Sequence, residues 1–139
     1  MKTSGKCLTT AQCSNISGYY SSQISRMCQK CATTCFNCIN ESHICSSCRS
    51  GYYLHVYKCL AECPTGYYKD GLSNMCVSCS QGDIHQKCVK CLSQGVCQQC
   101  NNTYFLYTVG ANQSVCLSTC PAGYYGYVAK CIKCKYPCL

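Results

Sequence analysis

The chain has 139 residues, of which 21 are cysteine and 13 tyrosine, while tryptophan is absent and only two residues are phenylalanine. A cysteine share of about 15 % indicates a disulfide scaffold and excludes an ordinary globular enzyme core, since shares above about 8–10 % are typical of cross-linked chains. Aliphatic residues are too few for the apolar core that a chain of this length normally builds. Disulfides formed in an oxidising compartment must replace that core, so we expect a secreted or cell-surface protein.

Twelve basic residues against four acidic ones give a formal net charge of +8. The basic residues are scattered, and only Lys130, Lys133 and Lys135 cluster. This distribution favours a solvated surface, with weak attraction to anionic glycans or membrane surfaces as the alternative. No basic stripe or known motif points to nucleic acid, so we expect no nucleic-acid partner.

The start of the chain lacks a secretion signal. Residues 1–7 contain no apolar h-region, and no run in the chain approaches the roughly 18 apolar residues that span a membrane. Because a secreted protein needs a signal peptide, we expect that Met1 is not the natural start. The chain is then an excerpt or a processed form, and neither end is a natural domain boundary.

A cysteine pattern recurs along the chain, which is the mark of a repeat protein. The repeat predicts three units, residues 1–58 and 59–115 with eight cysteines each and a truncated third unit over residues 116–139 with five. Five residues separate Cys7 from Cys13, where the later units have three, so the N-terminal edge is atypical.

Tyrosine motifs follow the cysteines in each unit. In chain order they are Gly18-Tyr19-Tyr20, Gly51-Tyr52-Tyr53, Gly66-Tyr67-Tyr68, Tyr104-Phe105 and Gly123-Tyr124-Tyr125. These segments are β-prone, and residues 52–57 are expected to turn back as a short hairpin. No stretch offers an i, i+3, i+4, i+7 apolar face, so helix should be nearly absent. We expect tyrosine rings to cover disulfides with their hydroxyl groups in water, and stacked units to form a rod.

These motifs together resemble a known family. The seven CxxC pairs, the CPxGYY segments at residues 63–68 and 120–125, and the CxxCxxGYYL segment at residues 45–54 resemble the furin-like repeats of the growth-factor-receptor cysteine-rich family. The resemblance extends from about Cys7 to Cys138, and the composition looks most like the large protist surface proteins with such repeats. It implies a small disulfide-rich fold of tandem repeats, an extended rod of short β-hairpins.

Spacing alone cannot assign disulfides, but the resemblance implies a pairing. The implied bridges are Cys13–Cys28, Cys31–Cys38, Cys35–Cys45, Cys48–Cys59, Cys63–Cys76, Cys79–Cys91, Cys88–Cys97, Cys100–Cys116 and Cys120–Cys131. Cys7, Cys134 and Cys138 are left over, and we expect them to pair outside this chain. A rival interpretation joins Cys7 of one molecule to Cys134 or Cys138 of the next in a covalent filament.

Other chemistries fit the residues less well. Zinc knuckles need CxxC pairs about 12–20 residues apart, and here consecutive pairs lie closer. His43, His55 and His85 could complete such sites, although isolated loop histidines are usually solvated. A redox CxxC needs a helix N-terminus in a βαβ unit, and neither is visible. The four acidic residues, which are far apart in the sequence, are Glu41, Glu62, Asp70 and Asp83. We expect no cofactor, no metal and no enzymatic activity.

Four Asn-x-Ser/Thr triplets are candidate N-glycosylation sites, and we expect at least two to be occupied. They are Asn15, Asn40, Asn101 and Asn112.

The sequence favours a structural role, in a stalk, coat or fibre whose partners are neighbouring repeats, copies of itself and N-glycans. The alternative is a receptor-like or ligand-like ectodomain that binds a protein ligand through Tyr67-Tyr68 and Tyr124-Tyr125, since tyrosine is enriched at binding hot spots.

Overall fold

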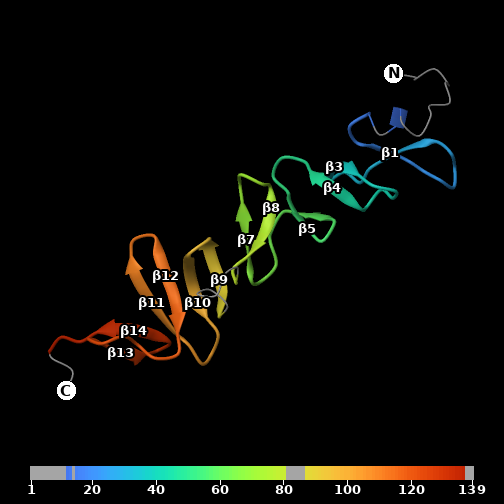
Figure 1. The fold of residues 1–139 in the computed structure, drawn as a ribbon. Coiled ribbons are helices and arrows are strands. Elements are labelled where there is room, and N and C mark those ends of the chain that lie inside the picture. The colour runs from blue at the N-terminus through green and yellow to red at the C-terminus, as the bar shows by residue number, and fades with distance from the viewer. Residues whose placement is uncertain (1–11, 14, 81–86, 137–139) are drawn as a thin grey trace. The chain divides into compact units, whose positions relative to one another are not determined.

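A computed structural model describes residues 12–13, 15–80 and 87–136 of the chain (Figure 1). Its regular elements are fourteen short β-strands, and among the described residues only Gln12 and Cys13 are helical. The prediction of a β-hairpin fold with almost no helix is therefore confirmed. Contacts divide the chain into two compact units, Met1–Glu62 with Ser73–Met75 and Cys63–Leu72 with Cys76–Leu139.

Three antiparallel hairpins make up the first unit. Their strands are β1 (Tyr19–Ser21), β2 (Cys28–Lys30), β3 (Cys35–Cys38), β4 (Cys45–Cys48), β5 (Tyr53–His55) and β6 (Lys58–Leu60). The β5–β6 hairpin lies where the sequence predicts one, with Leu54 opposite Cys59. Residues 73–75 complete the unit, because the Leu54 N–H donates to the Asn74 carbonyl at 2.9 Å.

Most strands of the second unit form one mixed sheet of six strands, in the order β13-β14-β11-β12-β10-β9. The remaining pair is β7 with β8. The bounds are β7 (Tyr67–Asp70), β8 (Met75–Ser78), β9 (Cys88–Ser93), β10 (Val96–Cys100), β11 (Phe105–Gly110), β12 (Gln113–Leu117), β13 (Tyr124–Tyr127) and β14 (Lys130–Lys133). The pairing of β11 with β14 is parallel and rests on one register pair, Leu106 opposite Lys130.

Disulfides supply the core of both units. Among the described residues, every buried apolar side chain except Val115 is a half-cystine. One cluster, in the first unit, gathers Cys35, Cys38, Cys45 and Cys59. The other, in the second unit, gathers Cys79, Cys88, Cys97, Cys100 and Cys116. Cross-links thus occupy the place that aliphatic side chains fill in an ordinary domain, as the composition predicts.

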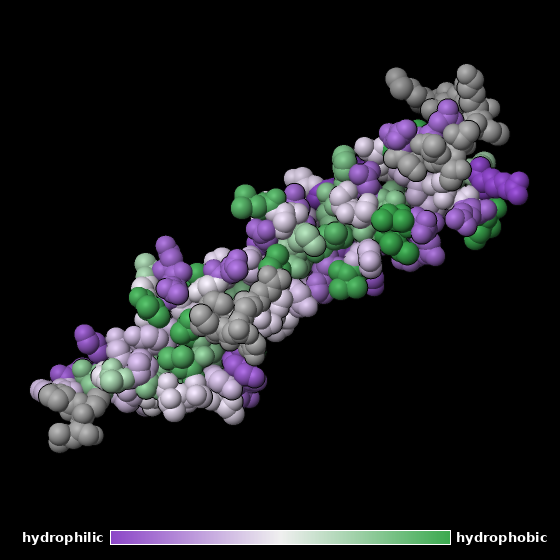
Figure 2. Space-filling model, viewed as in Figure 1, coloured by the Kyte–Doolittle hydropathy of each residue, from purple (hydrophilic) through white to green (hydrophobic). Residues whose placement is uncertain are grey.

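The outer surface carries further apolar residues, among them Ile24, Leu72 and Val128. On the face that Figure 2 shows, they are interspersed with polar residues and do not gather into one continuous patch. No helix within the described residues has the length and hydropathy needed to cross a membrane.

Candidate functional site: the repeated disulfide core

Nine disulfides join described cysteines, and each closes a loop with a sequence separation between 7 and 16 residues. Their pairs are Cys13–Cys28, Cys31–Cys38, Cys35–Cys45, Cys48–Cys59, Cys63–Cys76, Cys79–Cys91, Cys88–Cys97, Cys100–Cys116 and Cys120–Cys131. Each is a pair that the family resemblance implies. A loop of about 15 residues closed by a disulfide contributes about 3 kcal/mol, chiefly by restricting the unfolded chain.

Cys134 differs from the expectation. It is disulfide-bonded in this structure, to a partner outside the described residues, whereas the sequence predicts a partner beyond this chain. A cysteine pairs with whichever thiol brings the two Cα atoms within about 4.4–6.8 Å, and spacing does not say to which chain that thiol belongs. The expectations for Cys7 and Cys138 fall outside the described residues.

Each unit contains a module of two interleaved bridges followed by a third. In the first unit the bridges Cys31–Cys38 and Cys35–Cys45 are interleaved, because Cys35 lies inside the loop that the first bridge closes and Cys45 lies outside it. The bridge Cys48–Cys59 follows. In the second unit the same order is Cys79–Cys91, Cys88–Cys97 and Cys100–Cys116. A backbone hydrogen bond repeats as well. The N–H groups of Cys31, Cys79 and Cys134 donate to the carbonyl oxygens of Gly18, Gly66 and Gly123, respectively.

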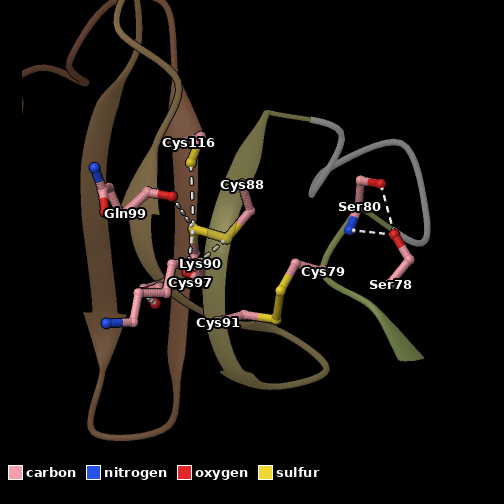
Figure 3. Close-up of a disulfide and its surroundings, with 10 residues drawn as sticks. Ser78, Cys79, Ser80, Cys88, Lys90, Cys91, Cys97, Gln99 and Cys116 are labelled. Carbon is pink, nitrogen blue, oxygen red and sulfur yellow. Dashed lines mark hydrogen bonds between the residues drawn. A yellow bond between two sulfur atoms is a disulfide. The ribbon is translucent and has the colours of Figure 1, made fainter. Parts of the chain in front are cut away.

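Within each module, sulfur atoms of neighbouring bridges come close together. The Sγ atoms of Cys97 and Cys116 lie 3.4 Å apart although they belong to different disulfides (Figure 3). The sulfurs of Cys88, Cys97 and Cys116 all lie within 4.8 Å of one another, and the equivalent group in the first unit is Cys35, Cys45 and Cys59. Half-cystines carry no S–H, so these are van der Waals contacts between bridges.

The zinc interpretation requires thiolates, because cysteine must be deprotonated to bind a metal. All six sulfurs of the two groups are consumed in disulfides, so they offer no thiolate. Among the histidines, His43 pairs with Glu41 at 3.2 Å, His55 lies on β5, and His85 is outside the described residues. Neither described histidine belongs to a sulfur group.

Tyrosines cover the disulfides, as the sequence predicts. Tyr20 and Tyr52 pack against the cysteine cluster of the first unit, and Tyr68 and Tyr104 pack against that of the second. The Tyr20 hydroxyl reaches the surface, where it donates to the Gln29 amide oxygen at 2.7 Å. Tyr125 follows the same Gly-Tyr motif but remains 49 % exposed.

The acidic residues take local structural roles where their contacts are defined. Glu41 pairs with His43 across an exposed turn, and the Asp70 carboxylate accepts the Leu72 N–H in the turn after β7. Asp83 is outside the described residues, and Glu62 is exposed. The two defined contacts are those of turns.

The four candidate glycosylation sites are all exposed. Asn15 lies in a turn before β1, and Asn40, Asn101 and Asn112 lie in turns or loops between strands, where an enzyme could reach them. The Asn101 amide oxygen accepts the Asn102 N–H at 2.8 Å. Occupancy of these sites stays a prediction.

Two hairpin tips have a backbone that the sequence does not predict. Val56 and Tyr57, between β5 and β6, have φ angles of 43° and 62°, and Val128 and Ala129, between β13 and β14, have 45° and 59°. Such left-handed turns usually contain Asn or Gly, and a β-branched residue with positive φ is uncommon. Val56 and Val128 are nevertheless 73 % and 74 % exposed.

Comparisons with known proteins relate parts of this chain to cysteine-rich segments of longer proteins. The chain is 32 % identical over 114 residues to proprotein convertase subtilisin/kexin type 5 of Mus musculus, which covers 79 % of this chain. It is 31 % identical over 155 residues to cysteine repeat modular protein 1 of Tetrahymena thermophila, which covers 88 % of it. It is 39 % identical over 80 residues to human R-spondin-3, which covers 56 % of it.

The chain corresponds to a small part of each of these relatives, 5 % of the convertase, 6 % of the repeat protein and 28 % of R-spondin-3. No family model matches the chain.

Proposed function

Because the chain belongs to the family of furin-like cysteine-rich repeats, we propose that it is an extracellular structural segment of a coat, stalk or fibre protein, stiffened by disulfides and N-glycosylated. One observation carries this proposal: the buried apolar side chains of the described residues are half-cystines, apart from Val115. Such a core forms only in an oxidising environment, and it holds the chain's shape without relying on an enclosed apolar interior.

The same core supports a non-catalytic role as part of this proposal. The described cysteines are consumed in bridges and offer no free nucleophile, and the defined contacts of the acidic residues are those of turns. The matched relatives are of different kinds, a convertase, a repeat protein and R-spondin-3, and they share with this chain a cysteine-rich segment. A segment common to such different proteins fits a mechanical or spacing role better than a shared reaction.

The experiment isolates the protein from its natural source without reductant, with free thiols blocked, and measures particle size by sedimentation and electron microscopy. A coat or fibre protein should appear as long assemblies or as large covalent species that reduction dissolves. A monodisperse species that keeps its size on reduction contradicts the structural proposal.

The alternative function is recognition of a protein partner through the hairpins. The left-handed, exposed tips at Val56-Tyr57 and Val128-Ala129 favour it, since a strained and apolar surface turn costs about 1–3 kcal/mol per residue and functional sites often retain such strain. Replacing both pairs by Asn-Gly should relieve the strain. If the tips bind a partner, capture of that partner is lost while the fold becomes more stable. If they are only connections, stability alone changes.

A further inference from the structure

A polar groove lies in the first unit between the loop after β1 and the turn that joins β3 to β4. Its volume is about 560 Å³, within the range of about 300–1,000 Å³ that ligand sites occupy. Its walls are formed chiefly by Tyr20, Ser25 and Gln29 on one side and by Asn40, Glu41 and His43 on the other.

Hydrogen bonds hold the first wall in place. The Tyr20 hydroxyl donates to the Gln29 Oε1 at 2.7 Å, and the Gln29 Nε2 donates to the Ser25 Oγ at 3.2 Å. The Ser25 N–H in turn donates to the Oγ of Ser22, a buried residue, at 3.2 Å. Because the Tyr20 ring also packs against the disulfide cluster, this wall presents an ordered aromatic ring and amide to the groove.

The second wall is a short turn that backbone bonds fix. The Ile39 N–H donates to the Ile44 carbonyl at 2.8 Å, and the Ala32 N–H donates to the Ser42 carbonyl at 2.7 Å. Asn40 lies in this turn with a left-handed backbone, φ 61°, and it is one of the residues that line the groove. Asn40-Glu41-Ser42 is also one of the four glycosylation triplets.

We infer that this groove is a saccharide site, and that its occupant is the innermost N-acetylglucosamine of a glycan carried on Asn40. A sugar ring has hydroxyl groups around its edge and C–H groups on its faces. The groove offers matching chemistry. The Tyr20 ring can pack against a face of the sugar, and Gln29, Ser25 and Glu41 can form hydrogen bonds with its hydroxyl and acetamido groups. A sugar bonded to Asn40 is tethered at the wall of the groove, so it loses less entropy on docking there than a free sugar would.

The attachment itself uses a lipid-pyrophosphate-linked oligosaccharide, the donor of the secretory pathway. The Asn40 Nδ2 forms a bond to C1 of the first sugar and loses a proton, while the bond from C1 to the lipid pyrophosphate breaks and the pyrophosphate leaves with its electron pair. The inference rests on the extracellular location proposed above and not on a coat or fibre role.

Asn40 differs from the other acceptors in its surroundings. Asn101 has its amide oxygen bonded to the neighbouring Asn102 N–H, and Asn112 stands in the exposed loop between β11 and β12. Of the four acceptors, Asn40 is the one that lines this groove. A glycan on Asn40 should therefore order the residues around it, and a glycan on Asn112 should not order the first unit.

The test expresses the chain in a secretory eukaryotic host and compares it with Asn40→Gln and, as the matched control, Asn112→Gln. The glycans are also trimmed enzymatically to one N-acetylglucosamine. Hydrogen exchange of residues 20–29, read by mass spectrometry, should be slower by roughly threefold to tenfold when the sugar occupies the groove. The trimmed protein and Asn112→Gln should retain this protection, and Asn40→Gln should lose it.

A further variant, Tyr20→Phe, keeps the ring but removes the hydroxyl bond to Gln29, and it should lower the protection while Asn40 stays glycosylated. A bare Asn40 in secreted material overturns the inference. So does a glycosylated Asn40 whose trimmed sugar leaves exchange of residues 20–29 unchanged. Either result leaves the proposed structural function standing, because that function is tested by particle size.

Discussion

The ring of Phe105 lies against the backbone of Gly126. A Cβ atom built on Gly126 would stand 2.5 Å from the Phe105 Cε1 and 2.7 Å from its Cζ, far closer than two carbons approach without repulsion. Phe105 belongs to β11 and Gly126 to β13, and β14 lies between these strands in the sheet. The absence of a side chain at residue 126 is therefore what lets the Phe105 ring pack over β14 onto β13.

We predict that Gly126→Ala destabilises the second unit by about 1–3 kcal/mol, the usual cost of forcing an extra methyl group into a packed contact. Gly71→Ala is the matched control, because a Cβ at Gly71 meets no heavy atom within 4 Å. It should be neutral or slightly stabilising. Urea unfolding with disulfides intact, followed by tyrosine fluorescence, compares the two variants. Equal losses in both would show that the Phe105 contact is unimportant.

Part of this architecture could be predicted from the sequence. Short, β-prone segments between cysteines give hairpins, and the scarcity of aliphatic residues requires a disulfide core. The Phe105 contact could not be predicted, because the residue after the tyrosine pair is Gly126 in one repeat and Lys69 in the preceding one. No residue pattern in the sequence indicates how close a side chain of β11 comes to the backbone of β13, because β14 lies between these two strands in the sheet.

The candidate site shows the same division. The family resemblance, and not the spacing, implies the disulfide pairs, since several pairings satisfy the same spacing. The left-handed tip at Val128 runs against the propensity of valine for extended structure, so only the three-dimensional structure reveals it. The contact between Cys97 and Cys116 joins two bridges whose packing no pairing scheme specifies.

Two serines that differ in their hydrogen bonding should respond oppositely to the same substitution. Ser114 is 4 % exposed, and its hydroxyl donates to the Cys97 carbonyl. Ser114→Ala should cost about 1–3 kcal/mol, because it leaves a buried acceptor with one bond fewer. The Oγ of Ser47 is buried without a hydrogen-bond partner among the described residues, so Ser47→Ala should be neutral or stabilising.

The measurement for this pair is the midpoint of urea unfolding for each variant against the unchanged chain. If both variants lose a similar amount of stability, the hydrogen bond from Ser114 to the Cys97 carbonyl adds nothing to the stability of the fold. The two substitutions would then act through packing alone.

Tyr107 and Tyr124 form an edge-to-face pair with ring centroids 5.0 Å apart. The hydrogen bond that the Tyr107 hydroxyl donates to Tyr124, then desolvation and the nearby phenolic group of Tyr124, raise the pKa of Tyr107. A pKa that is higher in the folded than in the unfolded state stabilises the fold at pH values below the unfolded pKa of about 10. This contribution is lost as the pH rises through the folded-state pKa.

We predict that Tyr124→Phe keeps the ring pair but lowers the pKa of Tyr107 toward its ordinary value. Rapid alkaline pH jumps, read by absorbance at 295 nm before disulfides exchange, measure the titration. Tyr127→Phe is the control, because Tyr127 is 63 % exposed and has no part in the pair. It should leave the pKa of Tyr107 unchanged. An unshifted Tyr107 in Tyr124→Phe would contradict the bond.

The contact between neighbouring bridges predicts a directed disulfide exchange. Cys100→Ser leaves a thiol on Cys116, whose sulfur lies 3.4 Å from Cys97 in the intact protein. The Cys116 thiolate can attack the Cys97 sulfur, forming Cys97–Cys116 and releasing a thiolate on Cys88. One thiol and one disulfide enter this step and one of each leaves it, so no oxidant is needed. The free thiol should therefore move from Cys116 to Cys88 in part of the molecules.

Cys63→Ser is the matched control, because it frees Cys76, which belongs to neither group of three close sulfurs. Its thiol should stay on Cys76. Alkylation at a series of times, followed by non-reducing peptide mapping, identifies the labelled cysteine in each variant. Label on Cys88 that grows with time and with pH supports the exchange, since the thiolate is the attacking species. If the label remains on Cys116 in Cys100→Ser, as it remains on Cys76 in Cys63→Ser, then the proximity of the two bridges does not lead to exchange.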